Sequence, residues 1–242
     1  APAVPEAGQL AAKLRVSPLL AQLLINRRIT TSAGGEAFLN PKLSDLIEPE
    51  QMPGIAEALE RITTAIEAKE KITIYGDYDV DGITGVAILW HMLKLLGADV
   101  DYYIPHRIDE GYGLNIDAIK AIADNGTKLL ITVDCGISAF DSARLAESLG
   151  LDLIITDHHR CSNQLPMAFA IVHPGIDPSY GNPDSAGAMV AFKLAWAAAN
   201  KFKKGTKLDA KLRQFLIDAT MFAGLGSIAD IVPLQGENRV IA

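Results

Sequence analysis

The stretch KITIYGDYDVDG (residues 71–82) decides the fold, because a strand pattern ends there on closely spaced carboxylates. The apolar run 71–75 leads into Asp77, Asp79 and Asp81, and Gly82 follows. Like charges this close repel one another, and a buried carboxylate must be paired or neutralised. A hard divalent cation, which prefers oxygen ligands, is the usual solution. An acidic turn exposed to solvent is the alternative.

The same pattern recurs twice further along the chain. The apolar run 128–133 ends on Asp134, and the run 151–156 ends on Asp157-His158-His159. Three strands with the apolar sequence of buried strands are each followed by aspartate. This pattern indicates one site at one edge of one sheet. The recurrence argues against a solvated acidic turn.

Strand and helix patterns alternate from Lys71 onward, which predicts an α/β fold with a mainly parallel five-stranded sheet flanked by helices. Strands are expected at 71–76, 100–105, 128–133, 152–156 and 168–172. Helices are expected over 82–96, from a cap at Asn115, from a cap at Ser138, and over 185–200 and 209–224, with a turn at Gly224–Gly226. Ligand sites in such sheets form outside the carboxyl ends of the strands, where the aspartates fall.

Residues 1–50 predict a helical leader, with one helix over 14–24 and a second that Thr31-Ser32 caps and that ends before Asn40-Pro41. Apolar residues at helical spacing from Ile55 to Ile66 predict the next helix. Residues 51–242 are expected to form the main domain. Asn238 resembles a helix start, but five residues are too few for a helix, so we expect the chain to be part of a longer protein.

Composition bounds the possible functions. The chain has 242 residues, of which 49% are hydrophobic, enough to bury a large core. No apolar stretch is long enough for a membrane span. The two cysteines provide neither a disulfide framework nor a zinc site, so a cytoplasmic protein is the simplest interpretation.

The net charge of −7 argues weakly against a protein that coats nucleic acid through its bulk charge. One segment is locally basic, and it is either a solvated surface or a DNA contact. Its basic residues are Lys201, Lys203, Lys204, Lys207, Lys211 and Arg213.

Carboxylates and histidine that share two divalent ions suit phosphoryl transfer, because such ions stabilise charge on phosphate oxygens and lower the pKa of water. The candidate metal ligands are Asp77, Asp79, Asp81, Asp134, His158 and, late in the chain, Asp230. Asp230 lies in an apolar setting, and its alternative role is a helix cap. No dinucleotide-binding, Walker or nucleophile-elbow motif is found.

A substrate phosphate also needs positive donors. Arg107 follows a strand at the same sheet edge, and guanidinium binds phosphate in a bidentate manner. The alternative role of Arg107 is a surface ion pair with Asp109 or Glu110. His159 is expected to contact substrate, since adjacent residues on a loop seldom ligate one ion.

The segment Gly76–Gly82, the turn Asp134-Cys135-Gly136 and the triplet Asp157-His158-His159 together resemble the DHH phosphoesterase superfamily. The segment 105–114 and the run Gly226–Leu234 are more particular, and they resemble the RecJ family of bacterial exonucleases specific for single-stranded DNA. The resemblance extends from about Lys71 to the last residue.

This resemblance implies a manganese- or magnesium-dependent 5′-to-3′ exonuclease that uses two ions, releases 5′-mononucleotides and acts in recombination and repair. It implies metal binding by the six ligands named above, with Asp81, Asp134, His158 and His159 catalytic. Arg107 and His159 would hold the scissile phosphate. Backbone amides at the helix start around Ser185 and Gly187 would add phosphate contacts.

The implied partner is single-stranded DNA, with repair or recombination proteins as further partners and a monomer as the expected state. The family carries a second catalytic-side domain and an oligonucleotide-binding barrel after this point. Two alternatives stay open at this stage. One is a phosphodiesterase, or pyrophosphatase relative, that acts on short oligonucleotides or cyclic dinucleotides. The other is a catalytically silent scaffold that binds DNA or a replication partner.

Overall fold

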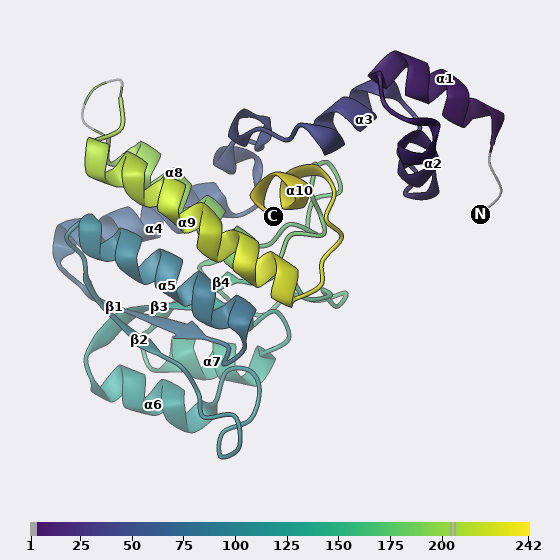
Figure 1. The fold of residues 1–242 in the computed structure, drawn as a ribbon. Helices are drawn as coiled ribbons and strands as arrows, with labels where there is room; N and C mark the ends of the chain where they lie inside the picture. The colour runs from purple at the N-terminus through teal and green to yellow at the C-terminus, as the bar shows by residue number, and fades with distance from the viewer. Residues whose placement is uncertain (1–3, 204, 206) are drawn as a thin grey trace. The chain divides into compact units, whose positions relative to one another are not determined.

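The structure, a computed structural model, describes residues 4–203, 205 and 207–242 (Figure 1). The chain divides into two compact units. The first comprises the residues up to Leu46 together with Leu234–Val240, and the second comprises Ile47–Pro233 with Ile241–Ala242. The expected boundary between leader and main domain at residue 50 stays a prediction.

The second unit is built on a five-stranded sheet in the order β2-β1-β3-β4-β5, in which every pair of neighbours is parallel. Its strands are β1 (Lys71–Gly76), β2 (Asp99–Tyr103), β3 (Thr127–Val133), β4 (Asp152–Thr156) and β5 (Ala170–Val172). This confirms the predicted mainly parallel sheet. Because β2 and β3 lie on opposite sides of β1, the topology reverses between β1 and β3, and such a reversal opens a crevice at the carboxyl ends of the strands.

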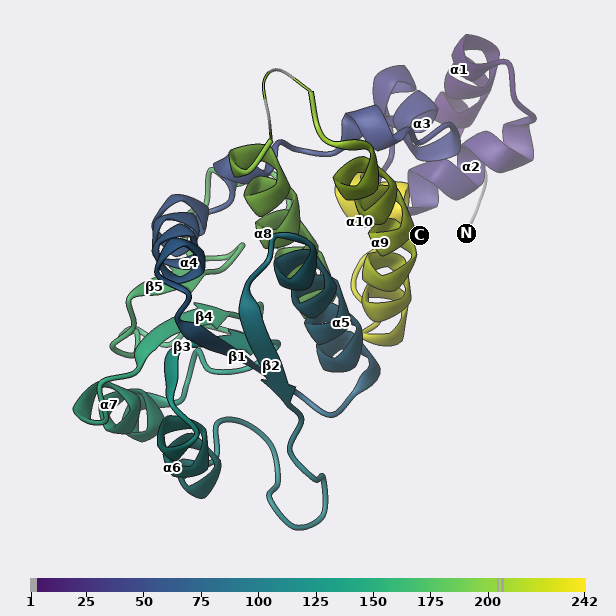
Figure 2. The ribbon, with the colours of Figure 1, turned by 90° about the vertical axis from the view of Figure 1, so that its left-hand side faces the viewer.

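Helices cover both faces of this sheet (Figure 2). One face packs against α4 (Ile55–Ala68), α5 (Val80–Leu95) and α8 (Gly187–Lys201), and α9 (Ala210–Ala229) packs on α5 and α8. The other face packs against α6 (Ile116–Asp124) and α7 (Phe140–Ser148). Strands covered on both faces need nearly continuous apolar sequence, and residues 129–131 and Val133 of β3 are fully buried.

The predicted turn at Gly224–Gly226 is wrong, because α9 continues through it to Ala229. Both glycines lie where another group approaches the helix closely. A Cβ on Gly226 would lie 2.5 Å from Asp81 Oδ1 and 2.6 Å from Ala188 Cβ, and one on Gly224 would lie 2.8 Å from the Ile241 carbonyl oxygen. The glycines therefore serve packing rather than chain reversal.

Other helix boundaries also differ from the prediction. The expected helix over 14–24 is two helices, α1 (Pro5–Leu14) and α2 (Pro18–Asn26), because Pro18 cannot continue a helix and Ser17 caps the new one. Ser138 does not cap α7, whose N-cap is Ala139. Asn238 lies inside α10 (Gly236–Ile241) rather than at its start.

Other predicted helix ends are confirmed. The Thr31 hydroxyl accepts a bond from the Gly34 N–H at the start of α3 (Ser32–Leu39), and Asn115 caps α6. The chain between α3 and α4 carries two short 3₁₀ helices, η1 (Leu43–Asp45) and η2 (Pro49–Gln51). Among the residues that the structure describes, no helix combines the length and apolar character that crossing a bilayer requires.

We expect Gly226→Ala to lower the free energy of unfolding by about 1–3 kcal/mol, because the added methyl group has no room beside Asp81 and Ala188. Urea denaturation of the full chain measures this. Gly8→Ala in α1 is the control, since no atom lies within 4 Å of its Cβ position and alanine favours a helix. A Gly226→Ala protein as stable as wild type would contradict the close packing of α9 on α5 and α8.

Candidate metal centre

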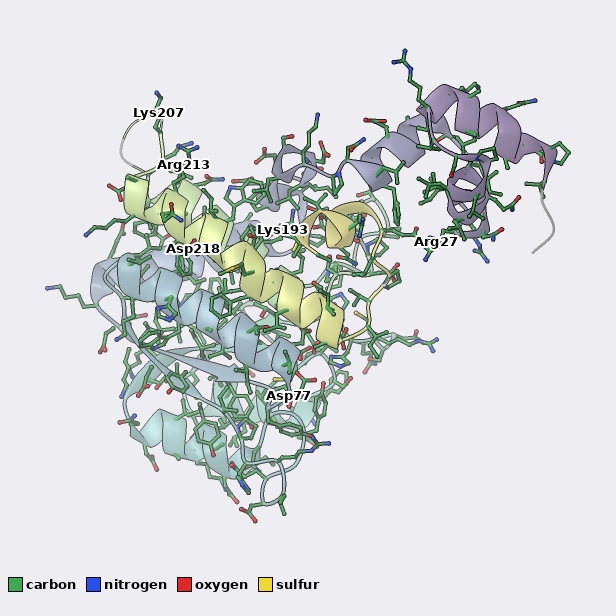
Figure 3. The ribbon with its side chains drawn as sticks, viewed as in Figure 1. Arg27, Asp77, Lys193, Lys207, Arg213 and Asp218 are labelled. Carbon is green, nitrogen blue, oxygen red and sulfur yellow. The ribbon has the colours of Figure 1, made fainter. Side chains whose placement is uncertain are left out.

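The predicted metal ligands meet at the carboxyl ends of β1, β3 and β4, at the point where the topology reverses. Asp77 lies where β1 ends (Figure 3), Asp134 follows β3, and His158 follows β4. Three overlapping groups of side chains present ligand atoms within 4.8 Å of one another. They are Asp77, Asp79 and Asp134; Asp81, His158 and Asp230; and Asp134, His158 and His159.

Asp77 and Asp79 hold different positions in the loop between β1 and α5. The side chain of Asp77 is buried, and its backbone N–H donates to the Val133 carbonyl, which ties the loop to β3. Asp79 is exposed and caps α5, since its Oδ1 accepts from the Gly82 N–H at 3.0 Å. Its carboxylate therefore combines a helix cap with a position in the first acidic group.

Asp81 is buried and linked to the start of α8. Its Oδ2 accepts from the Gly187 N–H at 2.6 Å, and its Oδ1 accepts from the Ala188 N–H at 2.9 Å. A helix N-terminus favours such a negative charge. The expected phosphate role for this helix start needs correction, because the Gly187 amide is already bound to a carboxylate.

Ser185, the other residue expected to bind phosphate, is fully buried. Its hydroxyl donates to the Asn182 carbonyl oxygen at 2.9 Å and accepts from the Asn182 side-chain amide at 3.0 Å. Ser185 therefore stabilises the turn before α8, and the geometry gives it no open donor toward a substrate.

Asp134 follows β3 in the left-handed backbone conformation, with a φ of 62°, which aspartate tolerates better than most residues. A Cβ on Gly187 would lie 2.7 Å from Asp134 Cβ, so only glycine lets α8 approach this turn. The side chain of Asp134 is almost fully buried. Backbone strain of this kind is common where a functional group must be aimed.

His158 lies at the centre of the site. Its Nε2 is 3.0 Å from Asp134 Oδ1, 3.7 Å from Asp81 Oδ2 and 3.8 Å from Asp230 Oδ2. Asp230 is the C-cap residue of α9, and its side chain is 28% exposed. The tertiary structure thus brings a residue about 70 positions away in sequence to the same histidine.

Three buried polar atoms in this centre form no aligned hydrogen bond with the described residues: Asp77 Oδ1, Asp134 Oδ1 and His158 Nε2. His158 Nε2 approaches Asp134 Oδ1 closely, but the two atoms are not oriented as donor and acceptor. Buried polar groups without partners are costly. Carboxylate oxygens and an imidazole nitrogen turned toward a common point suit a divalent cation. The residues therefore fit a metal.

Electrostatics support the same interpretation. Burial raises the pKa of Asp77, Asp81 and Asp134 above the usual range of aspartate. Burial lowers the pKa of His158, but the Asp134 carboxylate raises it, and the net shift is upward. A cluster that retains protons without a cation would release them as a divalent ion binds.

Asp157 supports the loop of the triplet rather than adding a metal ligand. Its Oδ2 accepts from the Ile137 N–H at 2.9 Å, and its Oδ1 accepts from the His158 N–H at 2.7 Å and the His159 N–H at 3.1 Å. Its Oδ1 also lies 2.8 Å from His159 Nδ1. In the sequence, the signal for this role is the position of Asp157 directly after a strand, as the first residue of the triplet.

His173, which the sequence left unassigned, also supports this loop. Its Nδ1 accepts from the Gly175 N–H at 2.9 Å, which leaves Nε2 to donate to the His159 carbonyl oxygen at 2.8 Å. Burial lowers the pKa of His173, in keeping with a neutral ring. No sequence pattern indicated this contact, because 14 residues separate the two histidines.

Arg107 is exposed, and its guanidinium lies 5.2 Å from the centre of the Tyr78 ring, beside the first acidic motif. Burial is the main cause of the raised pKa of Asp77, and the charges of His159 and Arg107 oppose that rise. Asp109, an alternative partner for Arg107, pairs instead with His106 at 2.7 Å.

A hydrogen-bond network holds the loop that carries Arg107. Tyr103 donates to the Glu110 carboxylate, which also accepts from the His106 N–H at 2.7 Å. The Tyr75 hydroxyl donates to the Gly113 carbonyl oxygen at 2.9 Å. The loop after β2 is therefore tied to the ends of β1 and β2.

The basic segment lies at the other end of α9 from Asp230 (Figure 3). The helix has 20 residues and is therefore about 30 Å long. Lys201, Lys203, Lys207, Lys211 and Arg213 are exposed, and Lys204 lies outside the described residues. The segment is thus far from the metal centre, which favours a solvated surface over a contact with the reacting phosphate.

We expect the pKa of His159 to be about 9 in the metal-free protein, because its ring nitrogen is hydrogen-bonded to Asp157. This raised value contributes stability that is complete below the usual pKa of about 6.5 and is lost as the pH rises through about 9. Imidazole NMR titration measures it. Asp157→Asn should return the midpoint toward 6.5, whereas Asp141→Asn should not. A midpoint near 6.5 in the wild-type protein would contradict the Asp157–His159 contact.

Comparisons with known proteins agree with this geometry. The single-stranded-DNA-specific exonuclease RecJ of Bacillus subtilis is 45% identical over 234 residues, which is 96% of this chain and 28% of that protein. A crystal structure of RecJ from Thermus thermophilus with Mn²⁺ is 30% identical, has a TM-score of 0.79 and covers 99% of this chain and 32% of its own. The Mg²⁺ complex of RecJ from that organism is 29% identical with a TM-score of 0.66, and it covers 99% of this chain and 29% of its own.

The chain therefore spans about a third or less of the length of these relatives. A family model, described as DHH family, N-terminal domain, matches residues 71–222. That match includes the whole sheet and every predicted site residue except Asp230. The chain belongs to the DHH family.

Proposed function

We propose that this chain is the metal-binding core of a 5′-to-3′ exonuclease that degrades single-stranded DNA to 5′-mononucleotides in recombination and repair. The observation that carries the proposal is the meeting of buried carboxylates with His158, where three polar atoms lack aligned partners. The similarity to the RecJ exonucleases, which are named as specific for single-stranded DNA, supports the substrate. The direction of digestion rests on the family resemblance alone.

The cofactor in this proposal is a pair of Mn²⁺ or Mg²⁺ ions, as the RecJ complexes with either metal support. The residues that would hold the ions are Asp77, Asp79, Asp81, Asp134, His158 and Asp230. When bound, such ions stabilise charge on phosphate oxygens and make water a stronger nucleophile. The protein supplies a mostly buried cluster of oxygen and nitrogen ligands whose atoms already lie within 4.8 Å of one another in each group.

The surrounding side chains would orient the phosphate. His159, which Asp157 holds protonated, would donate to a phosphate oxygen. Arg107 would add a second positive donor from the loop after β2, and Tyr78 restrains its guanidinium. Asp81 and Asp134 would be catalytic through the ions that they hold.

Several further statements belong to the proposal. A cytoplasmic location is supported by the two free cysteines, Cys135 and Cys161. Repair or recombination proteins as partners and a monomeric state are supported by the family resemblance alone. A main domain that begins near residue 51 is supported by the strand that follows at Lys71.

We expect Asp134→Ala and His158→Ala to reduce Mn²⁺ affinity and metal-dependent cleavage by at least about a hundredfold, because each removes a central ligand. Calorimetry measures Mn²⁺ binding. Release of mononucleotides from 5′-labelled single strands, with a duplex control and with EDTA, measures cleavage. Asp218→Ala, an exposed acid on α9, is the matched control. Cleavage that persists in EDTA would overturn the metal mechanism.

We expect Arg107→Ala to raise the KM for single-stranded DNA about 10- to 100-fold, since a hydrogen bond to a charged group contributes about 1.5–3 kcal/mol. Mn²⁺ affinity should not change, and Arg107→Lys should recover part of the loss. Arg27→Ala, which removes an exposed arginine at the end of α2, is the control. An unchanged KM in Arg107→Ala would remove Arg107 from the phosphate site.

A further inference from the structure

A cavity of about 570 Å³ opens beside the metal centre, within the size range of small-molecule sites. Its lining includes residues at the starts of α6 and α7, the helices that cover one face of the sheet. Three segments line it. The first runs from Tyr112 to the start of α6 at Ile116, without Asn115, the second is residues 136–142 between β3 and the first turn of α7, and the third carries Asp157 and His159 after β4. Of the residues that line the cavity, only Asp157 and His159 have a role in the proposed metal chemistry.

The cavity shares its inner wall with the metal centre. His159 forms part of that wall, and its ring centre lies 4.6 Å from that of His158. The Tyr112 hydroxyl lies 3.3 and 3.4 Å from the two ring nitrogens of His159. A group attached to a phosphate at the metal centre would therefore reach the cavity directly.

The lining is aromatic and aliphatic, with few free charges. Tyr112 and Phe140 contribute rings, and Ile116, Ile137 and Leu114 contribute aliphatic surface. Among the described residues that line the cavity there is no lysine or arginine. The cavity is thus unsuited to a second phosphate.

Its two carboxylates are already engaged. Both oxygens of Asp157 accept hydrogen bonds from the protein, and Asp141 pairs with Arg144. A cation site in the cavity is therefore disfavoured. A flat ring with apolar faces and a polar edge suits the lining, and the exposed Ser138 offers a hydroxyl to such an edge.

The walls are held in place before any ligand binds. The Ser142 hydroxyl donates to the Leu114 carbonyl oxygen at 2.8 Å, which ties the second segment to the first. The Ile137 N–H is bound to Asp157, and Gly136 adopts a φ of 114° that favours glycine. A preformed cavity loses little entropy when it binds a ligand.

We propose that this cavity binds the nucleobase of the nucleotide whose phosphate lies at the metal centre. The inference rests on the proposed function and deepens it. Stacking and apolar contacts tolerate any base, because every base has a π-face. The base must leave its own stack to enter the cavity, which favours a single strand over a duplex.

The test compares ligands with and without a base. Calorimetry in Mn²⁺ measures binding of thymidine and deoxyadenosine 5′-monophosphates and of 2-deoxyribose 5-phosphate. We expect both nucleotides to bind wild type about tenfold more tightly than the sugar phosphate. Ile116→Trp, which fills the cavity, should abolish this preference. Leu149→Trp is the matched control, since the two residues are 45% and 42% exposed and Leu149 lies outside the cavity.

Equal affinities for nucleotide and sugar phosphate in wild type would overturn the proposal, and this comparison needs no variant to fold. A base preference that survives in Ile116→Trp would also overturn it. The exonuclease assay separates the two proposals. Base-dependent binding without strand cleavage would support the cavity and reject the nuclease. Cleavage without a base preference would support the nuclease and reject the cavity.

Discussion

The contact on which the rest of the site depends is the carboxylate of Asp81 at the start of α8. Its two oxygens bind the Gly187 and Ala188 amides, so α5 and α8 meet at one buried charge. Gly226 lets α9 pass the same carboxylate without a clash. That approach brings Asp230, at the end of α9, to within 3.8 Å of His158. One buried carboxyl side chain thus joins three helices and places a distant ligand.

This arrangement concentrates negative charge where water is largely excluded. Asp77, Asp81 and Asp134 are each less than 5% exposed, and burial raises the pKa of all three. Burying several carboxylates together is unfavourable, and a bound divalent cation would compensate for it. The apolar core of the sheet does not contain these carboxylates, because they follow the carboxyl ends of the strands. The metal centre and the base-sized cavity then occupy neighbouring parts of this edge of the sheet, with His159 between them.

The sequence predicted the sheet well because three of its strands, β1, β3 and β4, combine a largely apolar run with an aspartate that follows it. These aspartates are Asp77, Asp134 and Asp157, and parallel strands necessarily bring them to one edge. Helix ends were harder to predict. The glycines of α9 suggested a turn, yet they lie within the helix because Asp81 and Ile241 approach there. The sequence around each glycine contains no information about such an approach, which depends on residues in other elements.

The sequence by itself determined the family and the parallel sheet, and it predicted the candidate metal ligands, because alternating elements and repeated strand-end aspartates are local patterns. Tertiary structure alone decided how those ligands are supported. In the structure the Gly187 amide donates to the Asp81 carboxylate, so it is not free to bind a phosphate. His173 is hydrogen-bonded through Nε2 to the His159 carbonyl oxygen. Tertiary structure also formed a cavity from three segments that are separate in the chain. These features are contacts between distant residues, and only the packing of helices and loops around the sheet edge specifies them.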